Sequence, residues 1–195
     1  MRLLGINYDN ENSVSINGRH ISRTSKPFVI AEVGNNHNGK IDLGYKLVEY
    51  AKKAGADCVK FQHRNMDNLY KDQGENDISA DLGTQYTKNL IRKFQLDFDD
   101  LVKLFDYCKE LEMIPLCTPW DIQTVGLLEY YGMPAYKIAS ADLNNFPLFK
   151  RIKSTNKPVI VSTGMASEVE VLAAFDFLNS NNMDHILLHC NSTYP

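Results

Sequence analysis

The sequence predicts an α/β fold, an incomplete (β/α)₈ TIM barrel. From residue 28 onward six short apolar segments alternate with helical segments, which is typical of a parallel sheet. A complete barrel needs about 250 residues and eight repeats, so six repeats within 195 residues predict a barrel that lacks its last quarter. An open doubly wound sheet normally carries a GxGxxG turn after its first strand, and Gly34-Asn-Asn-His-Asn-Gly39 does not match that turn.

Residues 1–27 are predicted to form an N-terminal β-hairpin and a linker, followed by the partial barrel domain at residues 28–195. Residues 13–22 alternate in polarity around Asn17-Gly18. This dipeptide favours a two-residue hairpin turn, because both of its residues tolerate positive φ. A polar linker then leads through Pro27 into the first barrel strand.

The barrel elements are assigned from the spacing of apolar residues and from Gly, Pro and Asp at their ends. Residues 63–87 are polar and too long for an ordinary connection, so we expect a functional loop or a partly mobile segment there. Strands are expected at 28–33, 57–62, 114–118, 135–139, 158–163 and 185–190, and helices at 42–54, 97–111, 121–131, 147–154 and 167–178.

The composition is that of an ordinary globular protein, with 44% hydrophobic residues and a net charge of −3. No basic stretch indicates nucleic-acid binding, and no apolar run reaches the ~20 residues of a membrane-spanning helix. The four cysteines show no CxxC spacing, and three lie in apolar runs. This pattern favours reduced thiols and a cytoplasmic location.

An acid lies inside the first apolar strand. Alternate residues of a strand share one face, so Phe28, Ile30 and Glu32 are expected to face the barrel lumen together. Burying a carboxylate costs several kcal/mol, as a rough figure, unless it is paired. Glu32 is therefore expected to have either a charged partner or a catalytic role.

Every predicted strand becomes polar at its carboxyl end, where barrel enzymes place their active sites. The amino ends carry ordinary turn residues, so this asymmetry favours an enzyme. The polar residues are Glu32, Lys60, Gln62, Thr118, Lys137, Ser140, Asp142, Ser162, Thr163, Ser192 and Tyr194.

Lys60 and Lys137 are the strongest of these signals, because each lies in an apolar strand. A lysine buried among apolar residues must meet an anion or lose its charge. With the nearby serine hydroxyls they predict a site for a phosphorylated or carboxylated ligand. A structural ion pair with Glu32 or Asp142 is the alternative. A Schiff-base role is also open to a desolvated lysine, although nearby acids would keep its ammonium charged.

The histidines do not form a recognisable metal motif, since neither HxH nor HExxH occurs. His37 is interpreted as a loop residue that bonds to the backbone. His189 is expected to be packed in the core. His63 is a candidate for the mouth of the site.

Several motifs resemble those of the sialic acid (N-acetylneuraminate) synthases, which condense phosphoenolpyruvate with an N-acylated amino sugar. The resemblance covers residues 28–195, and the motifs keep the family's order and spacing. They are Ile30-Ala-Glu-Val-Gly-Asn-Asn-His-Asn-Gly39, Val59-Lys-Phe-Gln62, Cys117-Thr-Pro119, Tyr136-Lys-Ile-Ala-Ser140 with Asn144-Asn145, Val161-Ser-Thr-Gly-Met165 and His189-Cys-Asn-Ser-Thr-Tyr-Pro195.

The resemblance implies roles for single residues. Glu32 matches an acid that handles protons, for example at C3 of phosphoenolpyruvate. Asp142 matches a second site acid, which is often the longer Glu in bacterial members. The positions matched to the carboxylate and phosphate of phosphoenolpyruvate are Lys60, Lys137, Ser140, Ser162 and Ser192. Those matched to the amino sugar, N-acetylmannosamine or an analogue, are Gln62, Thr118 and Tyr194.

The resemblance also implies a divalent metal, manganese or magnesium, acting as a Lewis acid. Its ligands are expected on a seventh and an eighth strand, outside this chain. It further implies a homodimer of the full-length protein. We therefore expect the 195-residue chain to be inactive alone and to expose unpaired sheet edges. Two alternatives stay open: an inactive ligand-binding or interaction module, and another phosphate-binding barrel aldolase.

Overall fold

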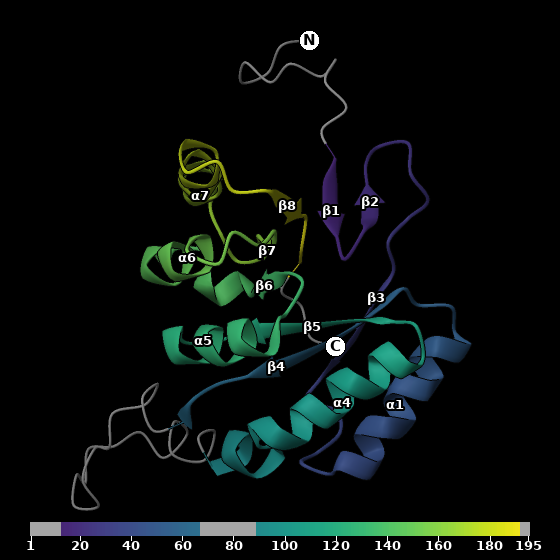
Figure 1. Cartoon of the computed structure of the whole chain (residues 1–195). Coiled ribbons are helices and arrows are strands. Elements are labelled where there is room, and N and C mark those ends of the chain that lie inside the picture. The colour runs from purple at the N-terminus through teal and green to yellow at the C-terminus, as the bar shows by residue number, and fades with distance from the viewer. Residues whose placement is uncertain (1–12, 67–88, 192–195) are drawn as a thin grey trace, which may run out of the picture.

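The computed structural model describes residues 13–66 and 89–191. Within them, six parallel strands form one curled sheet, part of a barrel, in the order β3-β4-β5-β6-β7-β8 (Figure 1). The order follows the chain without the reversal of a doubly wound sheet, so the predicted incomplete barrel is confirmed. The strands are β3 (Ile30–Gly34), β4 (Cys58–His63), β5 (Ile114–Pro119), β6 (Tyr136–Ile138), β7 (Val159–Ser162) and β8 (His185–Leu188).

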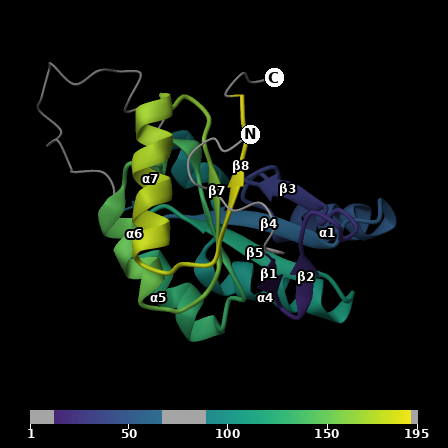
Figure 2. The same ribbon diagram turned by 90° about the horizontal axis from the view of Figure 1, so that it is seen from above.

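Helices cover the outer face of this sheet (Figures 1 and 2). They are α1 (Ile41–Lys53), α4 (Phe98–Glu110), α5 (Ile122–Tyr131), α6 (Phe146–Lys153) and α7 (Glu168–Ser180). Side-chain caps start four of them: Asp97, Asp121, Asn145 and Ser167 each accept a hydrogen bond from a backbone N–H of the first turn. Such short polar caps explain why the predicted starts of these four helices agree with the observed ones to within one residue.

The predicted hairpin is also confirmed. Strands β1 (Val14–Ile16) and β2 (Arg19–Ile21) pair antiparallel, and Asn17 and Gly18 form the turn with φ of 50° and 79°. Ile16 is fully buried against the amino-terminal part of the sheet's inner face. The hairpin thus covers the end of the curled sheet opposite the carboxyl ends of its strands. The apolar residues that it joins are Cys58, Leu116, Ala135 and Ile160.

The inner face of the sheet changes from apolar to polar along strands β4 to β7. The apolar residues Cys58, Leu116, Ala135 and Ile160 are each followed, two positions later, by a polar residue. Because alternate residues of a strand share a face, these polar residues also face inward. They are Lys60, Thr118, Lys137 and Ser162. Residues of opposite parity, including Val59 and Phe61, belong to the core shared with the outer helices. An apolar layer near the amino ends of the strands therefore packs beneath a polar layer at their carboxyl ends.

Three further points concern the edges of the sheet, the segment 63–87 and membrane-spanning helices. Strands β3 and β8 are the outer strands of this sheet in the described part of the chain. Residues 67–88 lie outside the described residues, so the expectation for the segment 63–87 stays a prediction. Within residues 13–66 and 89–191, no helix is long and apolar enough to cross a membrane.

Candidate active site

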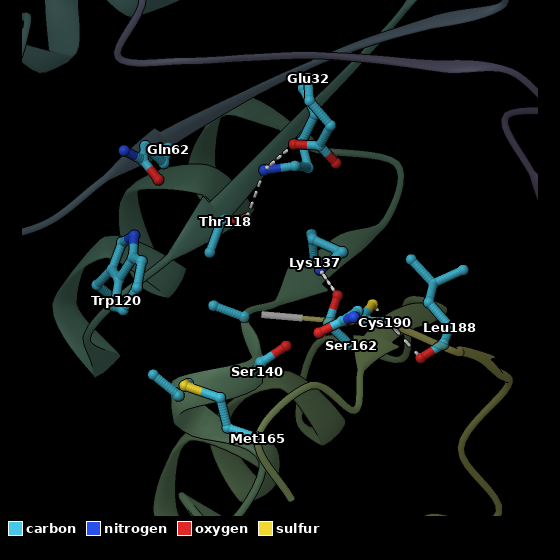
Figure 3. Close-up of a pocket in the computed structure, with 14 residues that line it drawn as sticks. Glu32, Gln62, Thr118, Trp120, Lys137, Ser140, Ser162, Met165, Leu188 and Cys190 are labelled. Carbon is cyan, nitrogen blue, oxygen red and sulfur yellow. Dashed lines mark hydrogen bonds and ion pairs between the residues drawn. The ribbon is translucent and has the colours of Figure 1, made fainter. Parts of the chain in front are cut away.

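A pocket of about 660 Å³ opens at the carboxyl ends of the strands (Figure 3). The structure brings together seven of the predicted site residues in its lining: Glu32, Lys60, Gln62, Thr118, Lys137, Ser140 and Ser162. Thr163 is turned away, and its hydroxyl donates to the carbonyl of Leu188 at 2.8 Å. Ser192 and Tyr194 lie outside the described residues, so their roles stay predictions.

Lys60 is held between a carboxylate and a hydroxyl. Its Nζ lies 2.8 Å from Oε2 of Glu32 and donates to Oγ1 of Thr118 at 3.1 Å. The lysine side chain is 7% exposed, whereas that of Glu32 is 57% exposed. The ion pair considered for this lysine is therefore present, and Glu32 has its expected charged partner. The pair leaves most of the carboxylate open to the pocket and solvent.

Lys137 has different partners. Its ammonium donates to Oγ of Ser162 and, at 2.9 Å, to the carbonyl of Ile138. Burial lowers the pKa of Lys137 to about 8, and the charge of Lys60 acts in the same direction, while Glu32 raises it. Desolvation thus outweighs the effect of Glu32, although a pKa of about 8 leaves most of the Lys137 ammonium charged at neutral pH.

Ser140 and Asp142 lie in a 3₁₀ turn (Ser140–Asp142) after β6. The Ser140 hydroxyl accepts a hydrogen bond from the backbone N–H of Gly164 at 3.0 Å, which ties the ends of β6 and β7 together. Asp142 accepts from the amide of Asn145 at 3.0 Å and is not among the pocket-lining residues. Its burial raises the pKa of the carboxyl, while Arg64 lowers it. Its predicted role in the site stays a prediction.

The pocket also contains residues that sequence reasoning missed, chiefly Trp120, Met165 and Cys190. Trp120 could have been found, because it follows Thr118 by two residues and so continues the inward parity of β5. Its backbone N–H donates to the carbonyl of His63 at 3.1 Å, and the guanidinium of Arg64 lies 4.4 Å from the centre of its ring.

The histidine predictions have mixed outcomes. His37 is buried in the turn after β3 and accepts a hydrogen bond from the backbone N–H of Gly39 at 3.2 Å, which confirms a loop histidine bonded to the backbone. The placement of His63 at the mouth of the site is wrong, because its ring packs against Phe98 of α4, 5.5 Å away. The packed-core prediction for His189 is wrong as well, since that residue is exposed beyond the end of β8.

The described residues do not fit a metal site by themselves. Among them, no group of three or more His, Cys, Asp or Glu side chains could hold a metal ion. The carboxylate that faces the pocket, Glu32, is paired with Lys60. All four cysteines are free, three of them buried, and burial raises the pKa of the Cys108 and Cys117 thiols to about 12. These buried thiols are therefore poor metal ligands near neutral pH.

The chain matches the model of the NeuB family over residues 47–195. It is 37% identical over 183 residues to an uncharacterized protein of Methanocaldococcus jannaschii, covering 93% of this chain and 51% of that protein. It is 34% identical over 176 residues to the N,N'-diacetyllegionaminic acid synthase of Campylobacter jejuni, covering 87% of this chain and 53% of the relative. The chain thus spans about half the length of the curated relatives it matches.

A solved structure agrees with this match. The N-acetylneuraminic acid (sialic acid) synthetase of Leptospira borgpetersenii, in complex with citrate, superposes with a TM-score of 0.83 and 28% identity. The superposition covers 95% of this chain and 61% of that protein. A truncated 3-deoxy-D-arabino-heptulosonate 7-phosphate synthase of Thermotoga maritima superposes with a TM-score of 0.66 but is 14% identical, so it is informative for the fold alone.

Proposed function

The chain belongs to the NeuB family, and we propose that it carries the phosphoenolpyruvate site of a synthase that joins phosphoenolpyruvate to an N-acylated amino sugar. The product would be a sialic or other nonulosonic acid, with release of phosphate. N-acetylmannosamine or a close analogue is the proposed acceptor, in line with the acylated products that the names of several relatives print.

One observation carries the proposal. Two lysines from different strands, both more than nine-tenths buried, converge on one pocket with a carboxylate and several hydroxyls. A cationic pocket lined by hydroxyl donors suits a small ligand that bears both a phosphate and a carboxylate. Phosphoenolpyruvate is such a ligand. Lys60, Lys137, Ser140 and Ser162 are the proposed binding residues.

In the proposed reaction, the C2–C3 π electrons of phosphoenolpyruvate form a bond from C3 to the aldehyde carbon of the open-chain sugar, and the aldehyde oxygen takes up a proton. Water then adds to C2 and gives up one proton. The bond between C2 and the phosphate oxygen breaks, and C2 becomes a ketone as its hydroxyl loses a proton to the departing phosphate. The lysine ammonium groups stabilise negative charge on the carboxylate and the departing phosphate. Glu32, exposed to the pocket and ion-paired with Lys60, can take the proton of the attacking water at its free oxygen.

Three accompanying expectations are also proposals. A divalent metal, manganese or magnesium, would polarise the aldehyde when bound, with ligands from outside the described residues. A homodimer is proposed for the whole protein. A cytoplasmic location is supported by the four free cysteines.

We further propose that this chain binds phosphoenolpyruvate but does not turn it over alone. Support comes from the described sheet, which ends in β3 and β8 instead of closing on itself, and from the lack of a metal-binding cluster in the described residues. Phosphate release from phosphoenolpyruvate and N-acetylmannosamine in the presence of manganese tests this. Steady turnover by the chain would overturn the proposed inactivity and leave the binding proposal intact.

Calorimetric titration of the chain with phosphoenolpyruvate tests the site itself. Lys60→Met and Lys137→Met should each weaken binding at least tenfold, because each removes a charge-assisted contact worth about 1.5–3 kcal/mol. Lys46→Met, at an exposed position of α1, is the matched control and should bind like the parent chain. Equal binding by all three variants would contradict the proposed site.

A second candidate, a lysine-dependent aldolase, is favoured by one observation, the lowered pKa of Lys137. A lysine that titrates near pH 8 offers a larger amine fraction than an ordinary lysine for Schiff-base formation. Borohydride treatment in the presence of pyruvate separates the two functions. A stable adduct on Lys137, located by mass spectrometry, would support the aldolase, whereas an unmodified lysine would leave the synthase as the better proposal.

A further inference from the structure

The pocket has two chemically different sides. In Figure 3, Lys137 and Ser162 lie on one side of the view and the side chains of Trp120 and Met165 on the other, and Lys60 lines the same pocket. The apolar pair comes from two separate loops, one after β5 and one after β7. The lysines and hydroxyls serve the proposed phosphoenolpyruvate, which leaves Trp120 and Met165 available to a second ligand.

Met165 is unusual for its backbone. Its φ is 63°, and it is 73% exposed at the pocket. The other described non-glycine residues with positive φ are polar: Asn17, Asn38, Glu112, Asn156 and Asn182. Asparagine adopts this conformation readily, whereas a bulky apolar residue there is an outlier. A methionine that is strained and exposed at a pocket is a candidate for contact with a ligand.

Trp120 is held in place from two directions. The hydrogen bond from its backbone N–H to the carbonyl of His63 joins the loop after β5 to the end of β4. Arg64 stacks on the face of its indole. Gln62 of β4 pairs in register with Thr118 of β5, and Trp120 follows Thr118 by two residues. Gln62 and Trp120 therefore line the same part of the pocket. The indole is thus a fixed wall next to an amide that can bond to a polar ligand group.

We propose that Trp120 and Met165 form an apolar clamp for the acyl group of the amino-sugar acceptor and so determine its specificity. The inference rests on the proposed function and deepens it. An amino sugar is covered with hydroxyl groups, and the alkyl part of its acyl amide is its main apolar substituent. Gln62, beside the clamp, is suitably placed to bond to the amide itself.

The sole tryptophan of the chain makes the clamp directly observable. Selective excitation of Trp120 in the presence of saturating phosphoenolpyruvate should give a blue-shifted or quenched emission when N-acetylmannosamine is added. Mannose, which lacks the acyl amide, should leave the emission unchanged at the same concentration. An equal response to both sugars, or a response to neither, would overturn the clamp.

Two variants test the contribution of each side chain by calorimetry. Trp120→Leu and Met165→Gly should each weaken N-acetylmannosamine binding about tenfold, a typical effect for an apolar contact in a specificity pocket. Phosphoenolpyruvate binding should stay within twofold of the parent. Val169→Ala, at a position of α7 that is 76% exposed and lies outside the pocket lining, is the control and should change neither ligand.

Met165→Gly also separates a binding role from a structural one. Glycine relieves the strain of positive φ, so the midpoint of thermal unfolding should stay constant or rise while sugar binding falls. A fall in both would assign Met165 to the fold and overturn its part in the clamp. If the parent chain itself did not bind phosphoenolpyruvate, the proposed function would be overturned. Failure of the clamp and failure of the proposed function are therefore distinguishable.

Discussion

Glu32 and Lys60 are register partners on β3 and β4, and their charged groups meet at 2.8 Å in very unequal surroundings. The lysine side chain is 7% exposed and that of the glutamate 57%. Removing one partner of an ion pair costs most when the remaining charge is buried. The two members of this pair should therefore respond differently to substitution.

Glu32→Gln should destabilise the chain more than Lys60→Met does. The first variant leaves a buried ammonium without its carboxylate, and we expect a loss of about 1–2 kcal/mol, less than for a fully buried pair because water reaches Glu32. The second leaves a carboxylate that water can solvate, and we expect a change within about 1 kcal/mol. Urea unfolding of both variants measures the difference. The reverse order would show that Lys60 is better solvated than its burial indicates.

Lys137 should make stability depend on pH. Its pKa falls from 10.5 to about 8 on folding, chiefly through burial. Between these pH values the unfolded chain binds the proton more strongly, so stability should rise as pH rises through this window. The penalty is complete below pH 8 and amounts to at most about 3 kcal/mol. Lys137→Met should therefore be more stable than the parent at pH 7 and similar to it above pH 10.5.

Because of Lys137, the binding of phosphoenolpyruvate should become weaker as the pH rises. Deprotonation of Lys137 removes a charge-assisted hydrogen bond to the ligand, so the affinity for phosphoenolpyruvate should fall as pH rises through about 8. Titrations from pH 6.5 to 9.5, roughly one and a half units on either side of that value, give the profile. The Lys137→Met variant should bind weakly with a flatter profile over the same range, and an equally steep profile would assign the effect to another group.

Gly39, the last residue of the motif Ile30–Gly39, should not tolerate a side chain. Its φ is 72°, and a Cβ at this position would lie 2.5 Å from the backbone carbonyl oxygen of Lys93. Strain and overpacking each cost about 1–3 kcal/mol, so Gly39→Ala should destabilise by about 3 kcal/mol or more. Gly132→Ala is the matched control, because its φ is 84° with no atom within 4 Å. It should cost about 1–2 kcal/mol, and equal losses would exclude the close contact as the cause.

Asp121 should contribute more than an ordinary helix cap. Its carboxylate accepts from the backbone N–H of Thr124 at 2.7 Å, the hydroxyl of Thr124 at 2.9 Å and the backbone N–H of Asn65 at 2.6 Å. Asp121→Ala should cost about 2–3 kcal/mol, since the buried hydroxyl of Thr124 and the part-buried N–H of Asn65 lose their acceptor in addition to the loss of the cap. Asp97→Ala, at an exposed cap of α4, should cost about 1 kcal/mol. Similar losses would show that the contacts with Asn65 and with the Thr124 hydroxyl add nothing to the cap.

Local patterns were sufficient for most of the fold. Asn17-Gly18 predicted its turn because only a few residue types accept two positive φ values in succession. The strands were predicted by apolar alternation and the helix starts by Asp and Ser caps. Strand parity also contained information that our interpretation did not use. His63 shares the parity of Phe61, which faces the helices, and Trp120 shares that of Thr118, which faces the pocket.

The sequence by itself determined the two layers of the inner face, because alternation sets which residues look inward before any long-range contact forms. It also determined that two lysines reach the carboxyl ends of the strands. Only the tertiary structure decided their chemistry. The register of β3 against β4 aligns Glu32 with Lys60, whereas β7 brings Ile160 and Ser162 to Lys137. Electrostatic energies depend on distance and on solvent, which are set by packing between strands far apart in the chain.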